Sequence, residues 1–174
     1  MKTKTILSVL CVLAWLGVVG YAVKLGSQAI SFGVSFLNPV AAEKIPGTAQ
    51  NLTALLQHDF WQYVCVMSLV IAVSAMSLSL WYSVSMLLTK LNVDSPFTAK
   101  VSKKMERIAY SLLSIWIVSF IGEKYVNWLS KTMDNPLDII NASSESLFTA
   151  GIVYIISQIF KRGVELQQEQ DLTI

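Results

Sequence analysis

The longest uncharged stretch of the sequence decides the fold class, and from Phe60 to Thr89 it reads FWQYVCVMSLVIAVSAMSLSLWYSVSMLLT. It lies between Asp59 and Lys90 and contains no acidic, basic or histidine residue. A helix needs about 20 mostly apolar residues to cross the hydrocarbon core of a bilayer. This stretch exceeds that length, so we predict a membrane-spanning helix that crosses with tilt or projects beyond the bilayer.

Three further uncharged stretches follow the same pattern, at residues 5–23, 108–122 and 146–160. The chain of 174 residues is 54% hydrophobic and 14% charged, whereas soluble domains carry about 25% charged residues. The first stretch is longer than the apolar part of a signal peptide and has no small-residue cleavage site, so we interpret it as an uncleaved span. The sequence therefore predicts one all-α domain over 1–174, an integral membrane four-helix bundle with spans at about 5–25, 60–88, 105–128 and 144–162.

The basic residues between the predicted spans indicate the orientation of the chain. Nine of its 13 Lys and Arg residues stand in the N-terminal, second connecting and C-terminal segments, and four stand in the other two connections. Loops rich in Lys and Arg stay in the cytoplasm. We therefore expect both termini in the cytoplasm of a bacterium, with the protein in its inner membrane. The course of the outer loop 26–58 stays open, because its first half either extends the first helix or lies on the outer interface.

Two cytoplasmic segments have recognisable patterns. Asp94-Ser95-Pro96-Phe97 is typical of a helix start, with Asp94 or Ser95 as the cap and Pro96 in the first turn. We expect an amphipathic helix start at 95–107 that continues into the third span. Its basic residues either contact anionic lipid or act only as the orientation signal: Lys100, Lys103, Lys104 and Arg107.

The C-terminal tail, residues 163–174, changes from apolar to polar and acidic. It is interpreted in two ways, as a frayed end of the last helix or as a docking tail for a partner.

The predicted spans hold little that indicates catalysis. Chemistry inside a membrane uses buried ionisable groups. The uncharged cores of the spans contain no Asp, Glu, Lys, Arg or His. His58 has no further ligand pattern around it, and Cys11 and Cys65 form no metal or disulfide framework. We therefore predict a protein that is not an enzyme, has no metal or other cofactor, and with a net charge of +2 does not bind nucleic acid directly.

Small and aromatic residues within the spans are candidates for helix packing. In the second span, small side chains recur at helical spacing and favour close contact between helices; a water-lined pore is the alternative. Trp15, Trp116 and Tyr154 lie deeper than the aromatic belt, which indicates helix packing or, alternatively, a ligand pocket. The predicted packing face consists of Ser68, Ala72, Ala75, Ser79 and Ser83.

Asp94-Ser95-Pro96-Phe97, Gly163, Leu166-Gln167, Glu169 and Asp171-Leu172-Thr173-Ile174 give the chain a family resemblance. It resembles an uncharacterised bacterial family of four-helix inner-membrane proteins, a domain of unknown function with a D-x-P-F loop motif and a C-terminal LQ-x-E-x-DLTI motif. Members are often encoded beside an Xre-type helix-turn-helix regulator. The resemblance implies a surface that docks such a partner, formed by Asp94, Pro96, Phe97, Leu166, Gln167, Glu169, Asp171, Leu172 and Ile174.

These features leave three hypotheses for function. The first is a sensor or scaffold of the inner membrane that engages a cytoplasmic regulator. The second is a small channel or transporter subunit, which needs a homo-oligomer because four uncharged helices are few for a pore. The third is an assembly factor for a larger membrane complex. The sequence does not identify the signal, the partner or the oligomeric state.

Overall fold

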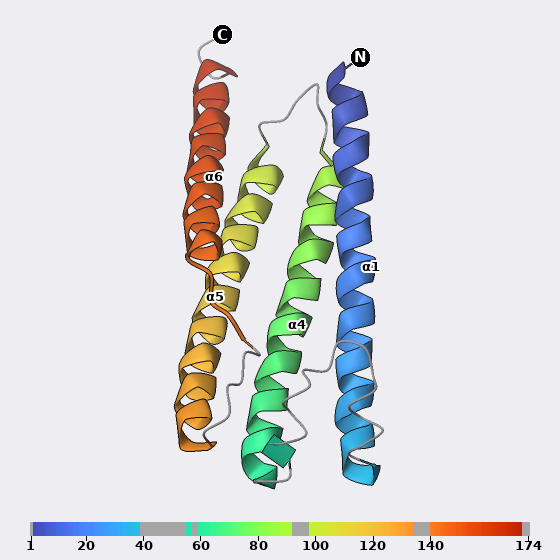
Figure 1. Ribbon diagram of the computed structural model, residues 1–174. Helices are drawn as coiled ribbons and strands as arrows, with labels where there is room; N and C mark the ends of the chain where they lie inside the picture. The colour runs from blue at the N-terminus through green and yellow to red at the C-terminus, as the bar shows by residue number, and fades with distance from the viewer. Residues whose placement is uncertain (1, 39–54, 57–58, 92–97, 134–139, 172–174) are drawn as a thin grey trace. The chain divides into compact units, whose positions relative to one another are not determined.

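The protein is all-α, and a computed structural model describes residues 2–38, 55–56, 59–91, 98–133 and 140–171. Each of its four long helices has the length and composition needed to cross a membrane, which confirms the prediction of a multi-pass membrane protein with four candidate spans. The helices are α1 (Lys2–Leu37), α4 (Phe60–Thr89), α5 (Ala99–Met133) and α6 (Ser144–Asp171) (Figure 1).

The helices continue beyond the predicted spans. α1 runs on to Leu37, so the described part of the segment after Lys24 extends the first helix. α5 is a single helix that joins the basic segment to the third apolar stretch, as the sequence predicted. α6 reaches Asp171, so the tail is helical from Gly163 to that residue.

The described part of α5 begins at Ala99. We expected Asp94 or Ser95 to cap it, and both lie outside the described residues. The helix begins at Ala99, and the Oγ1 atom of Thr98 accepts a hydrogen bond from the Val101 backbone N–H at 3.3 Å. Threonine is also a good N-cap, because its oxygen satisfies a backbone donor that the first turn leaves unpaired. Thr98 therefore caps the described helix, and the predicted role of Asp94 or Ser95 stays a prediction.

Four of the six serines of α4 donate their hydroxyl groups to carbonyls of their own helix. Ser68 donates to the Cys65 carbonyl at 2.8 Å, Ser77 to the Val73 carbonyl at 2.8 Å, and Ser83 to the Ser79 carbonyl at 2.9 Å. A hydroxyl without a partner is costly in hydrocarbon, whereas a serine bonded back to its own helix has its donor satisfied. These four serines therefore require no water beside the helix.

The chain divides into two compact units, which we describe separately. Unit 1 contains residues Met1–Val18, Ser79–Ser114 and Ser143–Ile174. Its core joins the end of α4 to α5 and α6 through Leu87, Val101 and Ile108, against which Val153 and Phe160 pack. A buried hydrogen bond from the Ser102 hydroxyl to the Ser157 carbonyl, at 3.2 Å, fixes α5 against α6.

Unit 2 contains Val19–Leu78 and Ile115–Ala142. Its core is the more extensive of the two, with Leu55, Val66 and Leu129 fully buried. Ile140 packs into the same core and also lies against Gly122 of α5. The Glu123 side chain accepts a hydrogen bond from the Ala142 backbone N–H at 2.8 Å, which holds the segment before α6 on α5.

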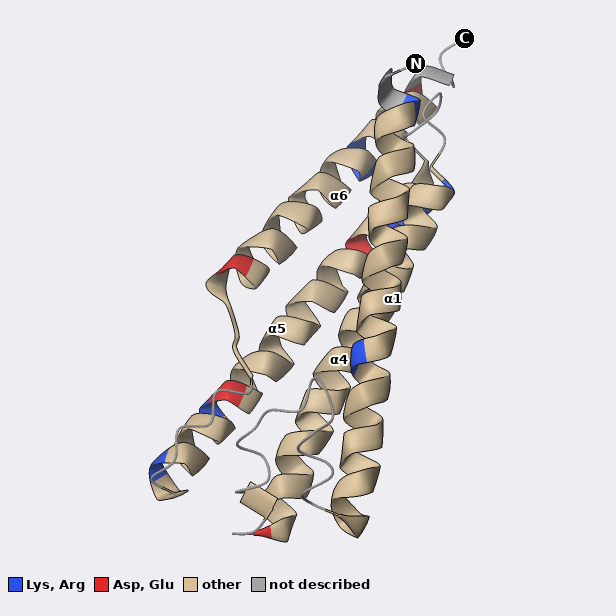
Figure 2. Cartoon of the chain, turned by 45° about the vertical axis from the view of Figure 1, so that its right-hand side comes forward, with Lys and Arg blue, Asp and Glu red and all other residues tan. Residues whose placement is uncertain are grey.

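Charged residues are unevenly distributed along the helices. In Figure 2 most of α1 and all of α4 are tan, the colour of residues other than Lys, Arg, Asp and Glu. α4 contains none, and α1 contains a single internal one, Lys24. Such a distribution is typical of helices whose middle parts stand in hydrocarbon, because a charge there is costly.

Candidate functional site

The last two and a half turns of α6, roughly, carry the predicted docking residues that the structure describes. Leu166 is 59% exposed, and Gln167 and Glu169 are exposed on the same stretch. Asp171 ends the helix. We call residues 163–171 the α6 extension. The side chain of Asp171 and five further predicted docking residues lie outside the described part of the chain: Asp94, Pro96, Phe97, Leu172 and Ile174, of which the first three belong to the loop before α5.

A polar hollow of about 350 Å³ marks the point where α6 leaves its apolar part. Gln158, Lys161, Arg162 and Glu165 line it. The Arg162 guanidinium pairs with the Glu165 carboxylate at 3.0 Å, and both side chains are substantially exposed. An exposed pair of this kind contributes little to stability, so these groups remain available to an incoming charged ligand.

The basic start of α5 is turned away from the core of unit 1. Lys100, Lys103 and Arg107 are exposed and Lys104 is half-buried, whereas Val101 is buried in the core. Their ammonium and guanidinium groups are therefore free to approach phosphate groups. This position fits the predicted contact with anionic lipid, which stays a prediction.

The packed face of α4 differs from the small-residue face that the sequence predicted. Ser68, Ala72, Ala75 and Ser79 are exposed, and Ser83 is half-buried. The buried serines of the helix are Ser74, Ser77 and Ser85. Ser77 follows Ser68 by nine residues, about two and a half turns, and so stands on the opposite side of the helix. Small residues occupy both sides of α4, and the bulkier Tyr63 and Met67 decide which side packs within the chain.

The three deep aromatic residues have different surroundings. The Trp15 ring lies edge-on to Tyr82 at 6.5 Å between centroids, and the Trp116 ring stacks on Phe120 at 5.2 Å. These two take part in aromatic contacts, as the packing interpretation predicted. Tyr154 lines a pocket instead, which is the alternative that the sequence left open.

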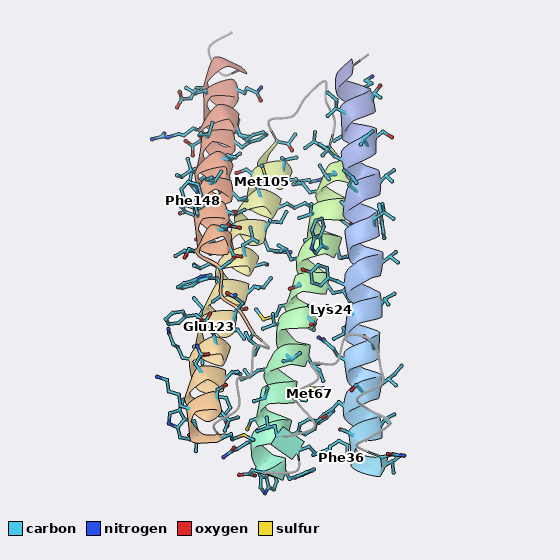
Figure 3. The ribbon with its side chains drawn as sticks, in the orientation of Figure 1. Lys24, Phe36, Met67, Met105, Glu123 and Phe148 are labelled. Atoms are coloured by element: carbon cyan, nitrogen blue, oxygen red, sulfur yellow. The ribbon has the colours of Figure 1, made fainter. Side chains whose placement is uncertain are left out.

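Sequence reasoning missed a polar face on the second half of α1. Gln28, Ser31 and Ser35 are buried in unit 2 at spacings of three and four residues, which places them on one side of the helix. The Tyr63 hydroxyl donates to Ser35 Oγ at 2.7 Å, and Ser35 donates to the Phe32 carbonyl at 2.7 Å. The spacing of these polar residues was a signal that could have revealed this face. Figure 3 shows the side chains of this region, with Phe36 and Met67 labelled.

No group of three or more His, Cys, Asp or Glu side chains gathers to hold a metal ion within the described residues. His58 lies outside them. Cys11 Sγ lies 3.2 Å from Thr89 Oγ1, a contact between α1 and α4 within unit 1.

The chain was compared with known protein families, curated proteins and solved structures. No curated protein and no solved structure matches it. A family described as "Protein of unknown function (DUF2975)" matches residues 37–174, from the last residue of α1 through the other three helices. Because the match covers most of the sequence, the chain belongs to this DUF2975 family of unknown function.

Proposed function

We propose that this protein is a non-enzymatic sensor or scaffold of the bacterial inner membrane that holds a cytoplasmic regulator through the α6 extension. One observation carries the proposal. α6 continues as a helix through Asp171, well past its apolar part, and presents exposed Leu166, Gln167 and Glu169. A helical extension with an apolar residue among polar ones is typical of a segment that binds in a groove of a partner.

The distribution of basic residues supports a cytoplasmic position for this extension. Lys161 and Arg162 precede it, and the basic start of α5 belongs to the same unit 1. The cytoplasmic ends of spans are enriched in Lys and Arg. A chain with four spans also has both its ends on one side of the membrane, which agrees with the count of basic residues.

The partner that we propose is an Xre-type helix-turn-helix regulator, because such regulators are often encoded beside members of the family that the motifs resemble. The regulator would bind DNA, and this protein would bind only the regulator. Glu165 and Glu169 are one turn apart on the extension, so the complementary groove should be apolar with basic residues at its rim.

Truncation after Arg162 is expected to abolish capture of the regulator. The truncation removes the α6 extension together with residues 172–174 and leaves the apolar part of α6 in place. Full-length and truncated proteins would be isolated from native membranes in mild detergent, and co-purified proteins identified by mass spectrometry. A soluble DNA-binding protein that is present with the full chain and absent after truncation supports the proposal.

A pair of point variants tests the same surface without deletion. Leu166→Glu and Gln168→Glu each add one negative charge to an exposed position of the extension. We expect Leu166→Glu to weaken capture about tenfold, because it removes an apolar anchor, and Gln168→Glu to leave it nearly unchanged. Unchanged capture by the truncated protein would show the proposal to be wrong. Stoichiometric recovery of another membrane protein would favour an assembly factor.

A second candidate function, a homo-oligomeric channel subunit, rests on the exposed small residues of α4. Ser79 is exposed and Ser83 is half-buried, so part of this face can pack against a second copy.

Under this hypothesis, combining Ser79→Leu with Ser83→Leu should abolish conductance in planar bilayers. Ser114→Leu serves as the control, because Ser114 is also exposed and bonded to its own helix, at 2.8 Å from the Tyr110 carbonyl. A current that the double substitution leaves unchanged would contradict the channel hypothesis.

A further inference from the structure

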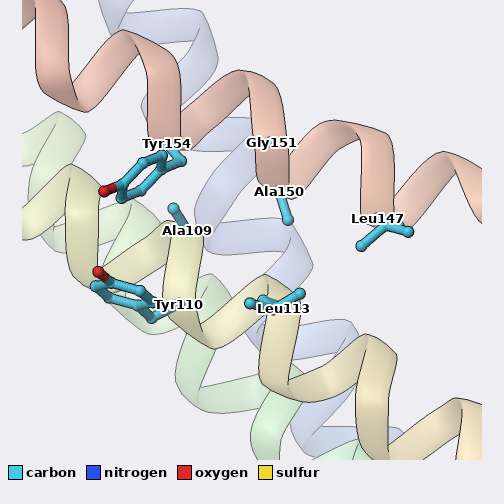
Figure 4. Close-up of a pocket in the computed structure, with 7 residues that line it drawn as sticks. All are labelled: Ala109, Tyr110, Leu113, Leu147, Ala150, Gly151 and Tyr154. Carbon is cyan, nitrogen blue, oxygen red and sulfur yellow. The ribbon is translucent and has the colours of Figure 1, made fainter.

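An apolar pocket of about 310 Å³ lies between α5 and α6 in unit 1. We call it the α5–α6 pocket. The small side chains of Ala109, Ala150 and Gly151 leave the space, and a Cβ atom placed on Gly151 would meet nothing within 4 Å. Figure 4 shows its lining residues: Ala109, Tyr110 and Leu113 of α5, and Leu147, Ala150, Gly151 and Tyr154 of α6.

Two contacts fix the spacing of α5 and α6, the helices that form the walls of the pocket. The Ser102 hydroxyl bonds to the Ser157 carbonyl at 3.2 Å. On the other side of α5, Ile108 belongs to the core against which Val153 of α6 packs. Two rigid helices joined by a buried hydrogen bond and an apolar core do not collapse readily into a neighbouring space. The pocket is therefore preformed between α5 and α6.

The two ends of the pocket differ in polarity. Figure 4 shows the hydroxyl oxygens of Tyr110 and Tyr154 at one end, whereas Leu147 lies toward the other. The two rings have centroids 5.9 Å apart. A tyrosine combines an apolar ring with a polar hydroxyl group. The pocket is therefore shaped for a molecule with an apolar chain and a polar head.

Basic residues continue the line of the pocket beyond its tyrosines. On α5, Lys103, Arg107 and Tyr110 recur at spacings of four and three residues, and on α6 Tyr154 and Lys161 are seven residues apart. Both spacings place the residues on one side of their helix. Lys161 is about 10 Å along the helix axis from Tyr154, and it lines the polar hollow. Cations thus lie beyond the polar end of the pocket on both helices.

The net charge of these two segments is strongly positive. Residues 100–107 and 158–165 contain six basic side chains against two carboxylates, Glu106 and Glu165. Glu165 already pairs with Arg162 at 3.0 Å. A group that neutralises the remaining cations must be anionic, and each cation close to an anionic lipid headgroup strengthens its binding about fivefold.

We propose that the α5–α6 pocket binds one acyl chain of an anionic phospholipid, whose phosphate is held by Arg107, Lys103 and Lys161. The pocket edge is open along the apolar surface, where Tyr110 is 52% and Leu147 is 40% exposed. In a membrane this surface faces lipid tails, so a lipid reaches the pocket by lateral movement. The charge at its polar end selects a negative headgroup. This inference does not depend on the proposed docking of a regulator.

Native mass spectrometry of the full-length protein in detergent micelles tests the proposal. Phosphatidylglycerol and phosphatidylcholine with identical acyl chains are the probes, and the wild type is expected to retain the anionic lipid preferentially. Gly151→Leu fills the pocket and should weaken retention of phosphatidylglycerol several-fold, because the acyl chain loses its packing contacts with α5 and α6. Gly20→Leu is the matched control, since the Gly20 position is equally open and lies on α1.

Charge variants separate headgroup recognition from pocket occupancy. Combining Arg107→Gln with Lys161→Gln should reduce retention of phosphatidylglycerol about fivefold for each cation removed and leave phosphatidylcholine unaffected. Lys131→Gln, an exposed cation near the far end of α5, is the control. Equal retention of both lipids by the wild type, or unchanged retention by Gly151→Leu, would overturn the proposal. It would also be overturned if the wild type were a dimer that Gly151→Leu dissociates, because a second copy of the chain would then occupy the pocket.

Discussion

Gly17→Leu is expected to destabilise the protein by about 3 kcal/mol, because it overpacks the contact between α1 and α4 in unit 1. A Cβ atom on Gly17 would stand 2.6 Å from Trp81 Cε3 and 2.8 Å from Trp81 Cδ2. These atoms belong to a rigid indole ring and not to the flexible end of a side chain. The ring or the helix must therefore move. The measurement is unfolding in mixed detergent micelles, followed by circular dichroism and tryptophan fluorescence.

The loss of stability in Gly17→Leu is to be compared with the losses in two other variants, Gly20→Leu and Gly122→Leu. Gly20 has open space around its Cβ position, so its substitution should leave stability nearly unchanged. At Gly122 the new Cβ would meet Ile140 Cδ1 at 2.9 Å, the flexible end of a side chain, so an intermediate loss is expected. Equal stability of the Gly17→Leu and Gly20→Leu proteins would contradict the close approach of α1 and α4.

Tyr63→Ala is expected to cost about 2 to 3 kcal/mol through lost packing in unit 2. Tyr63 is 3% exposed, and its ring stacks on Phe32 at 6.2 Å between centroids. Within a bilayer the unfolded helices are also in an apolar medium, so the loss comes from contacts and the cavity and less from transfer out of water. The free energy of unfolding in mixed micelles measures it.

Tyr63→Phe separates the ring from its hydroxyl. The phenylalanine keeps the packing and removes the hydrogen bond to Ser35, which is 2.7 Å long. Ser35 still donates to the Phe32 carbonyl, so we expect a cost of only about 0.6 kcal/mol. Phe148→Ala is the control for loss of an aromatic ring, because Phe148 is 71% exposed. If Tyr63→Phe proves as costly as Tyr63→Ala, the hydrogen bond and not the ring holds this contact.

The helices were predictable because charge is so costly in hydrocarbon that a long apolar stretch without any charge is typical of a membrane span. The ends of the helices were not predictable from the same signal. Lys24 interrupts the apolar run of α1, yet the helix continues to Leu37. A lysine can extend its ammonium group toward water while its backbone stays helical. A charge therefore indicates where the hydrocarbon ends, and not where the helix ends.

The packing surfaces were less predictable, because they depend on what the neighbouring helices present. Ser68 and Ser77 have the same side chain and similar sequence surroundings, but Ser68 is exposed and Ser77 is buried. The α5–α6 pocket depends on Gly151 lying opposite the small residue Ala109, a pairing of residues far apart in the chain. Tyr154 was recognisable as unusual from its depth in the predicted span, but its partner Tyr110 was not.

The length of α1 has a consequence for how the protein is immersed. Its 36 residues extend about 54 Å, whereas the hydrocarbon core is about 30 Å thick. At the tilts of up to about 40° that spanning helices adopt, the helix still covers about 40 Å along the membrane normal. Several turns of α1 therefore stand among headgroups or in water. A thicker or thinner bilayer would change which of these turns are hydrated, while the chain stays helical throughout.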